Sequence, residues 1–169
     1  MNRYELEHII RAAGDIAGVK SLIILGSQSV LGQFPNLAES FPESDHSKLS
    51  FISRKRQTLC RSVEADIMVP ESEDKAEVIE AVIGELSSFH DTFGYYAQGV
   101  DHTTSKLPEG WENRLIEICN SNTKGISGLC LEFMILSYQN YMRHGKRILN
   151  SLMRQYFSDS YQKIFCQSD

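Results

Sequence analysis

The short run Ser21-Leu22-Ile23-Ile24-Leu25 constrains the fold of this chain more than any other feature of its sequence. Four successive apolar residues leave neither side of an extended strand suited to water, so the run predicts a strand covered on both faces. Such a strand lies inside a parallel or mixed sheet. A helix that ends at Gly18 is predicted before it, because apolar residues recur at helical spacing: Leu6, Ile9, Ile10, Ala13 and Ala17.

A second strand is predicted at residues 62–69, where side chains alternate with a period of two. Pro70 ends this strand, and the acidic stretch 71–74 suits the first turn of a following helix. The apolar face of that helix is predicted to carry Ala76, Ile79, Val82, Ile83 and Leu86.

Further strands are predicted near residue 114. Residues 114–119 form one strand, a loop holds Gly125, Ser127 and Gly128, and residues 129–132 open a last strand or helix. This order of helices and strands predicts an α/β (α+β) fold in which helices flank a small mixed sheet.

The length of 169 residues, 41% of them apolar, suits one domain. We expect that domain over residues 1–132, with a polar insertion at about 35–61. No apolar run reaches the roughly 20 residues of a membrane helix, so no membrane partner is expected. The N-terminus has no signal-peptide pattern, and the four cysteines form no CxxC pair, which favours reduced thiols and a cytoplasmic location.

Two carboxylates on the second strand are the first candidate site. Glu64 and Asp66 are two positions apart, so they share one side of the strand at a spacing of about 6.6 Å. Two anions at that distance repel by roughly 2–3 kcal/mol at an effective dielectric near 20. Mg²⁺ or Mn²⁺ would relieve this repulsion, since both prefer hard oxygen ligands. The alternative is the solvated outer face of an edge strand.

Gly26 and Ser27 follow the apolar strand directly, and a short helix is predicted after them, before Pro35. The N–H groups at a helix start, together with a hydroxyl, can hold a phosphate, and glycine lets the backbone approach it. The alternative is an ordinary turn between a strand and a helix. The turn is not a Walker loop, because Gln33 stands where that motif needs lysine.

The turn and the carboxylate strand together resemble the nucleotidyltransferase superfamily of DNA polymerase β. In that superfamily an h-G-[GS] turn precedes a [DE]-h-[DE]-h strand, where h is an apolar residue. Six stretches resemble one bacterial branch of it, the nucleotidyltransferase-like proteins of unknown function related to the AbiEii toxins. They are GSQ at 26–28, EAD at 64–66, FHDTFGYYAQGV at 89–100, LPEGW at 107–111, NTKG at 122–125 and GLCLE at 128–132.

The resemblance implies that Gly26, Ser27 and Gln28 bind a nucleoside triphosphate and that Glu64 and Asp66 hold Mg²⁺ or Mn²⁺. It also implies transfer of the nucleotidyl group to an RNA or protein acceptor, and a cognate antitoxin as a partner. This chain departs from the superfamily pattern in two ways. Its first ligand is glutamate rather than aspartate, and the gap between Ser27 and Glu64 is longer than usual.

The superfamily normally adds a third carboxylate from a later strand. Glu117 and Glu132 are the two candidates for it here, and their spacing does not choose between them. A surface position is the alternative for each.

The charge of the chain reverses after residue 132. The first 132 residues hold 20 acidic and 12 basic side chains, whereas the last 37 hold two acidic and five basic. Codons can be chosen for residues 133–149 such that a one-nucleotide shift encodes the H-D-L-I-L-S-K-L motif that follows in the family. We therefore expect that residues 133–169 are a frameshifted tail, which would truncate the family's C-terminal part. A divergent native helix is the alternative.

Three functions are compatible with these patterns. The first is a metal-dependent nucleotidyltransferase, toxin-like in a defence or toxin–antitoxin pair. The second is a catalytically inactive relic that still binds a nucleotide. The third is an α/β partner-binding module whose carboxylates only decorate its surface.

Overall fold

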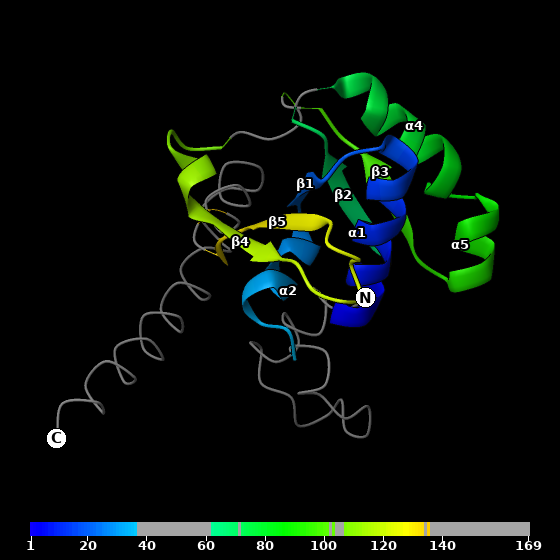
Figure 1. The fold of residues 1–169 in the computed structure, drawn as a ribbon, viewed down its shortest axis with the longest axis horizontal. Helices are drawn as coiled ribbons and strands as arrows, with labels where there is room; N and C mark the ends of the chain where they lie inside the picture. Colours follow the sequence, from blue (N-terminus) through cyan, green and yellow to red (C-terminus); the bar gives the residue numbers. More distant parts are fainter. Residues whose placement is uncertain (37–61, 71, 102, 104–106, 134, 136–169) are drawn as a thin grey trace, which may run out of the picture.

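The computed structural model describes residues 1–36, 62–70, 72–101, 103, 107–133 and 135. Within them the chain forms an α+β fold around one mixed five-stranded sheet (Figure 1). This confirms the predicted fold class. Most of the predicted insertion at about 35–61 and most of the predicted tail lie outside the described residues.

The first helix, α1 (Arg3–Ala17), begins and ends where its sequence provides caps. The Asn2 side chain accepts a hydrogen bond from the Glu5 backbone at 2.9 Å, and the Glu5 carboxylate accepts one from the Asn2 backbone at 2.7 Å. At the other end Gly18 adopts the left-handed conformation with a φ of 62°. The predicted helix and its stop at Gly18 are confirmed.

The sheet consists of β1 (Ser21–Leu25), β2 (Glu64–Met68), β3 (Tyr96–Gly99), β4 (Leu115–Ile118) and β5 (Ser127–Leu131). Their order is β3-β2-β1-β5-β4. The apolar strand β1 is therefore central, as predicted, and it runs antiparallel to β2 and parallel to β5. At the edges, β3 is parallel to β2 and β4 is antiparallel to β5.

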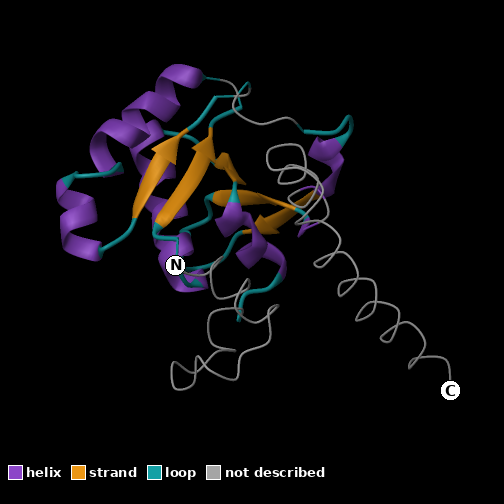
Figure 2. Cartoon of the chain, turned by 180° about the vertical axis from the view of Figure 1, so that it is seen from behind, coloured by secondary structure: helices purple, strands orange, loops and turns teal. Residues whose placement is uncertain are grey.

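Helices cover mainly one face of the sheet. The longer ones are α1 and α4 (Glu73–Ile83), and α2 (Val30–Gln33) follows the short 3-10 turn η1 (Ser27–Ser29). Two more elements complete the chain, α5 (Ser88–Phe93) and the 3-10 helix η2 (Trp111–Arg114). Figure 2 views the sheet from behind, with β2 and β3 in front of α1 and α4. No helix within the described ranges has the length and hydropathy to cross a membrane.

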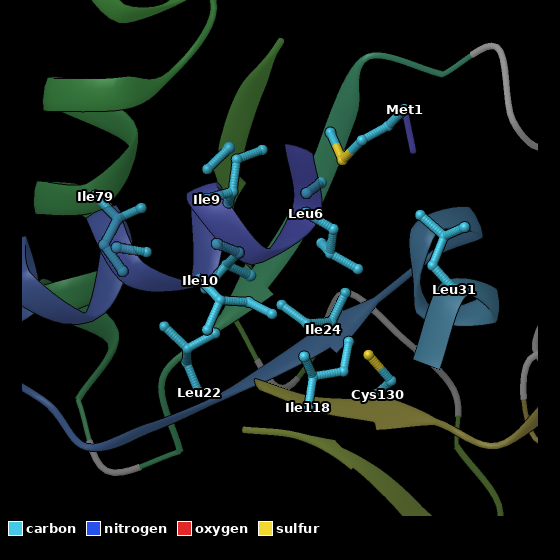
Figure 3. Close-up of a cluster of buried hydrophobic side chains, with 14 of the residues drawn as sticks. Met1, Leu6, Ile9, Ile10, Leu22, Ile24, Leu31, Ile79, Ile118 and Cys130 are labelled. Atoms are coloured by element: carbon cyan, nitrogen blue, oxygen red, sulfur yellow. The ribbon is translucent and has the colours of Figure 1, made fainter. Parts of the chain in front are cut away.

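The main hydrophobic core lies between the sheet and these helices, as Figure 3 shows. Leu22 and Ile24 of β1 point into this core, while Ile23 and Leu25 point to the opposite face. There they contact Met68 and Leu131 in a second, smaller core. Both sides of β1 are thus covered, which explains why its sequence does not alternate.

Two sequence predictions about the helix after β2 are wrong. Val82 and Leu86 were expected on its inward face, but both are exposed. The buried side chains of α4 are Ala76, Ile79 and Ile83. These positions already form a complete stripe at helical spacing, and the helix ends at Ile83, so its periodicity does not extend to Leu86.

Two further predictions are wrong at strand boundaries. Ser127 and Gly128 belong to β5 rather than to a loop, because they pair with Ser21 and Leu22 of β1. A Cβ at Gly128 would overlap Ile10 of α1. Glycine at this position lets helix and strand approach closely. The strand predicted at 62–69, whose alternation sets Val63 on the same inward side as Ala65 and Ile67, is shorter: β2 begins at Glu64, and Val63 precedes it and is exposed.

A buried carboxylate, Glu7, ties α1 to the connection between β4 and β5. It accepts hydrogen bonds from Arg3 Nε at 2.8 Å, Asn120 Nδ2 at 2.8 Å and Asn122 Nδ2 at 2.7 Å. Burial of this carboxyl raises its pKa, but the three hydrogen bonds and the positive charge of Arg3 outweigh burial. The pKa of Glu7 therefore lies below its ordinary value of 4.5.

We expect Glu7→Gln to destabilise the fold at neutral pH by about 1–2 kcal/mol, because one amide oxygen cannot replace a charged acceptor of three bonds. Since the folded-state pKa is lowered, this stabilisation is present above pH 4.5 and is lost as the pH falls through the folded-state value. Urea unfolding of the wild type and of Glu7→Gln at several pH values measures the difference in their free energies of unfolding. The difference between the two proteins should shrink below pH 4.5, whereas the exposed control Glu109→Gln should match the wild type at every pH. A difference in stability that does not change with pH would show that the ionised form of Glu7 does not stabilise the fold.

Candidate functional site

The two predicted carboxylates lie on the sheet face opposite α1 and α4. Ala65 and Ile67 of β2 are buried in the main core, so Glu64 and Asp66 point to the other side. The alternation read from the sequence is therefore correct for these residues. Asp66 is also in register with Leu25, the last residue of β1, which places it beside the turn that follows.

Asp66 and Gly26 are in direct contact. A Cβ built on Gly26 would overlap Asp66 Oδ2, so only a residue without a side chain allows this approach. The Gly26 backbone has φ 61° and ψ −160°, a conformation that is essentially restricted to glycine. The structure thus brings together the turn and the second carboxylate, as the sequence predicted.

Hydrogen bonds hold the turn after β1 in place. The Gly26 carbonyl accepts from Ser29 Oγ at 2.8 Å. Gln28 is 1% exposed, and its Nε2 donates to the Ser62 carbonyl at 3.2 Å, which links the turn to the chain before β2. Of the three predicted nucleotide-binding residues, Gly26 and Ser27 are partly exposed. Gln28 is buried, and its amide positions the other two.

Glu64 has a partner that the sequence analysis did not assign, Tyr96 of β3. The two residues are in register, and the Tyr96 hydroxyl donates to Glu64 Oε2 at 3.0 Å. Burial, then the hydrogen bond to Glu64, then nearby carboxylate charge raise the pKa of Tyr96 to about 12. The phenol therefore stays protonated and holds Glu64 in one orientation.

The ring of His90, from α5, packs against the ring of Tyr96 with centroids 4.7 Å apart. Its Nδ1 accepts a hydrogen bond from the Leu86 backbone at 3.1 Å. His90 therefore joins the chain that follows α4 to the tyrosine that holds Glu64.

The neighbouring Tyr95 points to the opposite side of the sheet. Its hydroxyl lies 2.8 Å from His8 Nδ1 on α1, and its ring packs with those of Phe89 and Phe93. Phe89, Phe93 and Tyr95 thus form a packing cluster between α1, α5 and the start of β3.

Both candidates for a third carboxylate have other partners in the structure. Glu117 is on β4, three strands from β2 and thus about 14 Å away, and it accepts from Ser127 Oγ at 2.5 Å. Glu132 forms an ion pair with Arg114, whose Nε donates to it at 2.7 Å. The residue in register with Asp66 on the outer side is Gln98.

The donor set is consequently two carboxylates. No group of three histidine, cysteine, aspartate or glutamate side chains that suits a metal occurs in the part of the chain that the structure describes. Mg²⁺ in proteins is commonly bound by one or two carboxylates, with water and substrate phosphates as the other ligands. Glu64 and Asp66 fit a cation of that kind, and they do not form an all-protein metal cage.

Comparisons with protein-family models, curated proteins and solved structures find no match to this chain. The geometry of Gly26, Glu64, Asp66 and Tyr96 is therefore what the functional argument rests on.

We expect Gly26→Ala to destabilise the protein more than Gly18→Ala. Both glycines have a positive φ, but a Cβ at Gly18 meets open space and its backbone conformation is accessible to other residues. Alanine there should cost roughly 1–2 kcal/mol, whereas at Gly26 the added clash with Asp66 should bring the cost to about 3 kcal/mol or more. Chemical denaturation of the two variants measures the difference. Equal losses would show that the turn at Gly26 tolerates a side chain as well as the helix end at Gly18 does.

The hydrogen bond between Tyr96 and Glu64 can be tested by titration of the phenol. Glu64→Gln should lower the Tyr96 pKa from about 12 toward 10 without reaching it, because burial remains. Ultraviolet difference absorbance against Tyr96→Phe isolates the signal of this tyrosine. Since the folded-state pKa is raised, the contact stabilises the fold below pH 10 and loses this effect as the pH rises through about 12. An unchanged pKa in Glu64→Gln would contradict the contact.

Proposed function

We propose that this chain is a metal-dependent nucleotidyltransferase that transfers a nucleotidyl group from a nucleoside triphosphate to an RNA or protein acceptor. The observation that supports this most is the direct contact of Asp66 with Gly26. It joins a carboxylate suited to a cation and a backbone turn suited to phosphate at one place on the sheet. Carboxylates that are merely exposed on the outer face of a strand do not need a turn beside them whose backbone conformation only glycine adopts.

In this reaction a hydroxyl oxygen of the acceptor attacks the α-phosphorus of the nucleotide. The bond from that phosphorus to the oxygen bridging the β-phosphate breaks, pyrophosphate leaves, and the hydroxyl proton passes to water. Glu64 and Asp66 would hold Mg²⁺ or Mn²⁺, which supplies positive charge to offset that of the phosphates. Gly26 and Ser27 provide the turn that phosphates approach, and Tyr96 keeps Glu64 oriented.

A second candidate function is a nucleotide-binding module without turnover. The distance of Glu117 from β2 and the ion pair of Glu132 favour it, because the first candidate for the superfamily's third carboxylate is remote from Asp66 and the second is already bound to Arg114. Both candidates need Gly26, Glu64 and Asp66, and they differ in whether pyrophosphate is released.

The full chain should be incubated with Mg²⁺ and each α-labelled nucleoside triphosphate, with transfer RNA or with protein as the acceptor. We expect label transfer with at least one nucleotide, and a loss of about 100-fold or more in Asp66→Asn, since a charged group that stabilises phosphate is removed. Glu112→Gln, at an exposed position of η2, is the matched control and should retain full activity.

Nucleotide binding by equilibrium dialysis separates the two candidates. Binding that needs Mg²⁺ and Asp66, without any transfer or pyrophosphate, supports the non-catalytic module. Transfer that survives the double variant Glu64→Gln and Asp66→Asn would exclude these carboxylates from the reaction.

A further inference from the structure

The outer side of α4 carries an exposed apolar stripe. Val78 is 48% exposed and Val82 is 50% exposed, and the two lie one helical turn apart on the same side of the helix. Ala81 beside them is also exposed. Leu86, three residues beyond the end of the helix, is 84% exposed. We call these four residues, with the acidic side chains described next, the α4 surface.

Acidic side chains lie along one side of this stripe. Asp74, Glu77 and Glu80 recur every three residues along α4, Glu85 precedes Leu86, and all four are exposed. Residues 72–94 contain one basic side chain, Lys75. Among the described residues, the structure shows no ion pair for any of the four carboxylates. The α4 surface is thus apolar along its line of valines and strongly negative beside it.

Leu86 is held in its exposed position by the backbone. Its φ of 62° lies in the left-handed region, which costs a leucine roughly 1–2 kcal/mol. Its N–H donates to His90 Nδ1 at 3.1 Å, and the Ser87 side chain caps α5 just after it. A large apolar side chain in a strained conformation and facing water gives nothing to the stability of this chain alone.

We infer that the α4 surface is a docking site for a basic amphipathic helix of a partner protein. The apolar stripe complements the apolar face of such a helix, and the flanking carboxylates complement its lysine or arginine side chains. A second copy of this chain is a poorer occupant, because pairing two α4 helices would bring two acidic rows together. At a rise of 1.5 Å per residue, α4 presents about 16 Å of length, which matches three turns of a partner helix. This inference does not depend on nucleotidyl transfer.

The probe is a fluorescein-labelled synthetic peptide with leucine at helical spacing and lysine at the remaining positions. Two control peptides have the same composition in shuffled order, or glutamate in place of lysine. Fluorescence anisotropy with the full chain measures their dissociation constants. The amphipathic basic peptide should bind at least about tenfold more tightly than either control, and its affinity should fall as salt is added.

Leu86→Gly is the most informative variant, because glycine accepts the left-handed conformation and the fold should be at least as stable as the wild type. Peptide binding should nevertheless weaken by about tenfold or more, since a buried leucine contact is lost. The double variant Asp74→Asn and Glu77→Gln should weaken binding and reduce its salt dependence. Tyr4→Ser, at a 67% exposed position on α1, is the matched control and should bind like the wild type.

Three results would overturn the inference. One is a basic amphipathic peptide that binds no better than the shuffled peptide, which would show unspecific attraction by charge. Another is unchanged binding in Leu86→Gly. The third, measured by sedimentation, is self-association of the chain that Leu86→Gly abolishes, which would assign the α4 surface to a second copy.

Discussion

The candidate site depends on one contact, the approach of the Asp66 carboxylate to the Gly26 backbone. The antiparallel pairing of β1 and β2 creates it, because the register sets Leu25 opposite Asp66 and the turn starts one residue later. Forty residues separate the two partners along the chain. A side chain at Gly26 would overlap the Asp66 carboxylate as it stands, so the lack of one links the sheet register to the site. The hydrogen bond from Gln28 to Ser62 ties the same two segments a second time.

Features that depend on local periodicity could be predicted from the sequence. The unbroken apolar run of β1 identified a central strand, and the alternation of β2 assigned Glu64 and Asp66 to one face. The resemblance to nucleotidyltransferases added roles for these residues, and those roles stay a prediction. The α4 helix marks the limit of such reasoning. The apolar stripe that buries α4 is complete at Ile83, where the helix ends. Apolar residues continue in the sequence after that point, so the sequence does not show where the buried stripe stops.

Features that depend on contacts between distant segments could not be predicted. No local pattern in the sequence predicts that β3 pairs with the outer edge of β2, which places Tyr96 opposite Glu64. The order of strands decides in the same way that Glu117, on the correct face, is still three strands from β2. The sequence offers two glutamates for a third ligand, and the structure gives each another partner, Ser127 or Arg114. Pairing of this kind is set by the whole sheet and by the connections between its strands.

Tyr95, just before β3, and Tyr96, its first residue, have a consequence for how this edge strand is aligned. The Tyr95 hydroxyl is hydrogen-bonded to His8 on the face of the sheet that α1 covers, and the Tyr96 hydroxyl donates to Glu64 on the opposite face. A slip of β3 by one residue would exchange the sides of both rings and break both bonds at once. Edge strands have a neighbour on one side only and are the ones most prone to such slips. The two hydrogen bonds, one on each face of the sheet, therefore fix the register of β3, and a substitution at His8 on α1 would remove one of them.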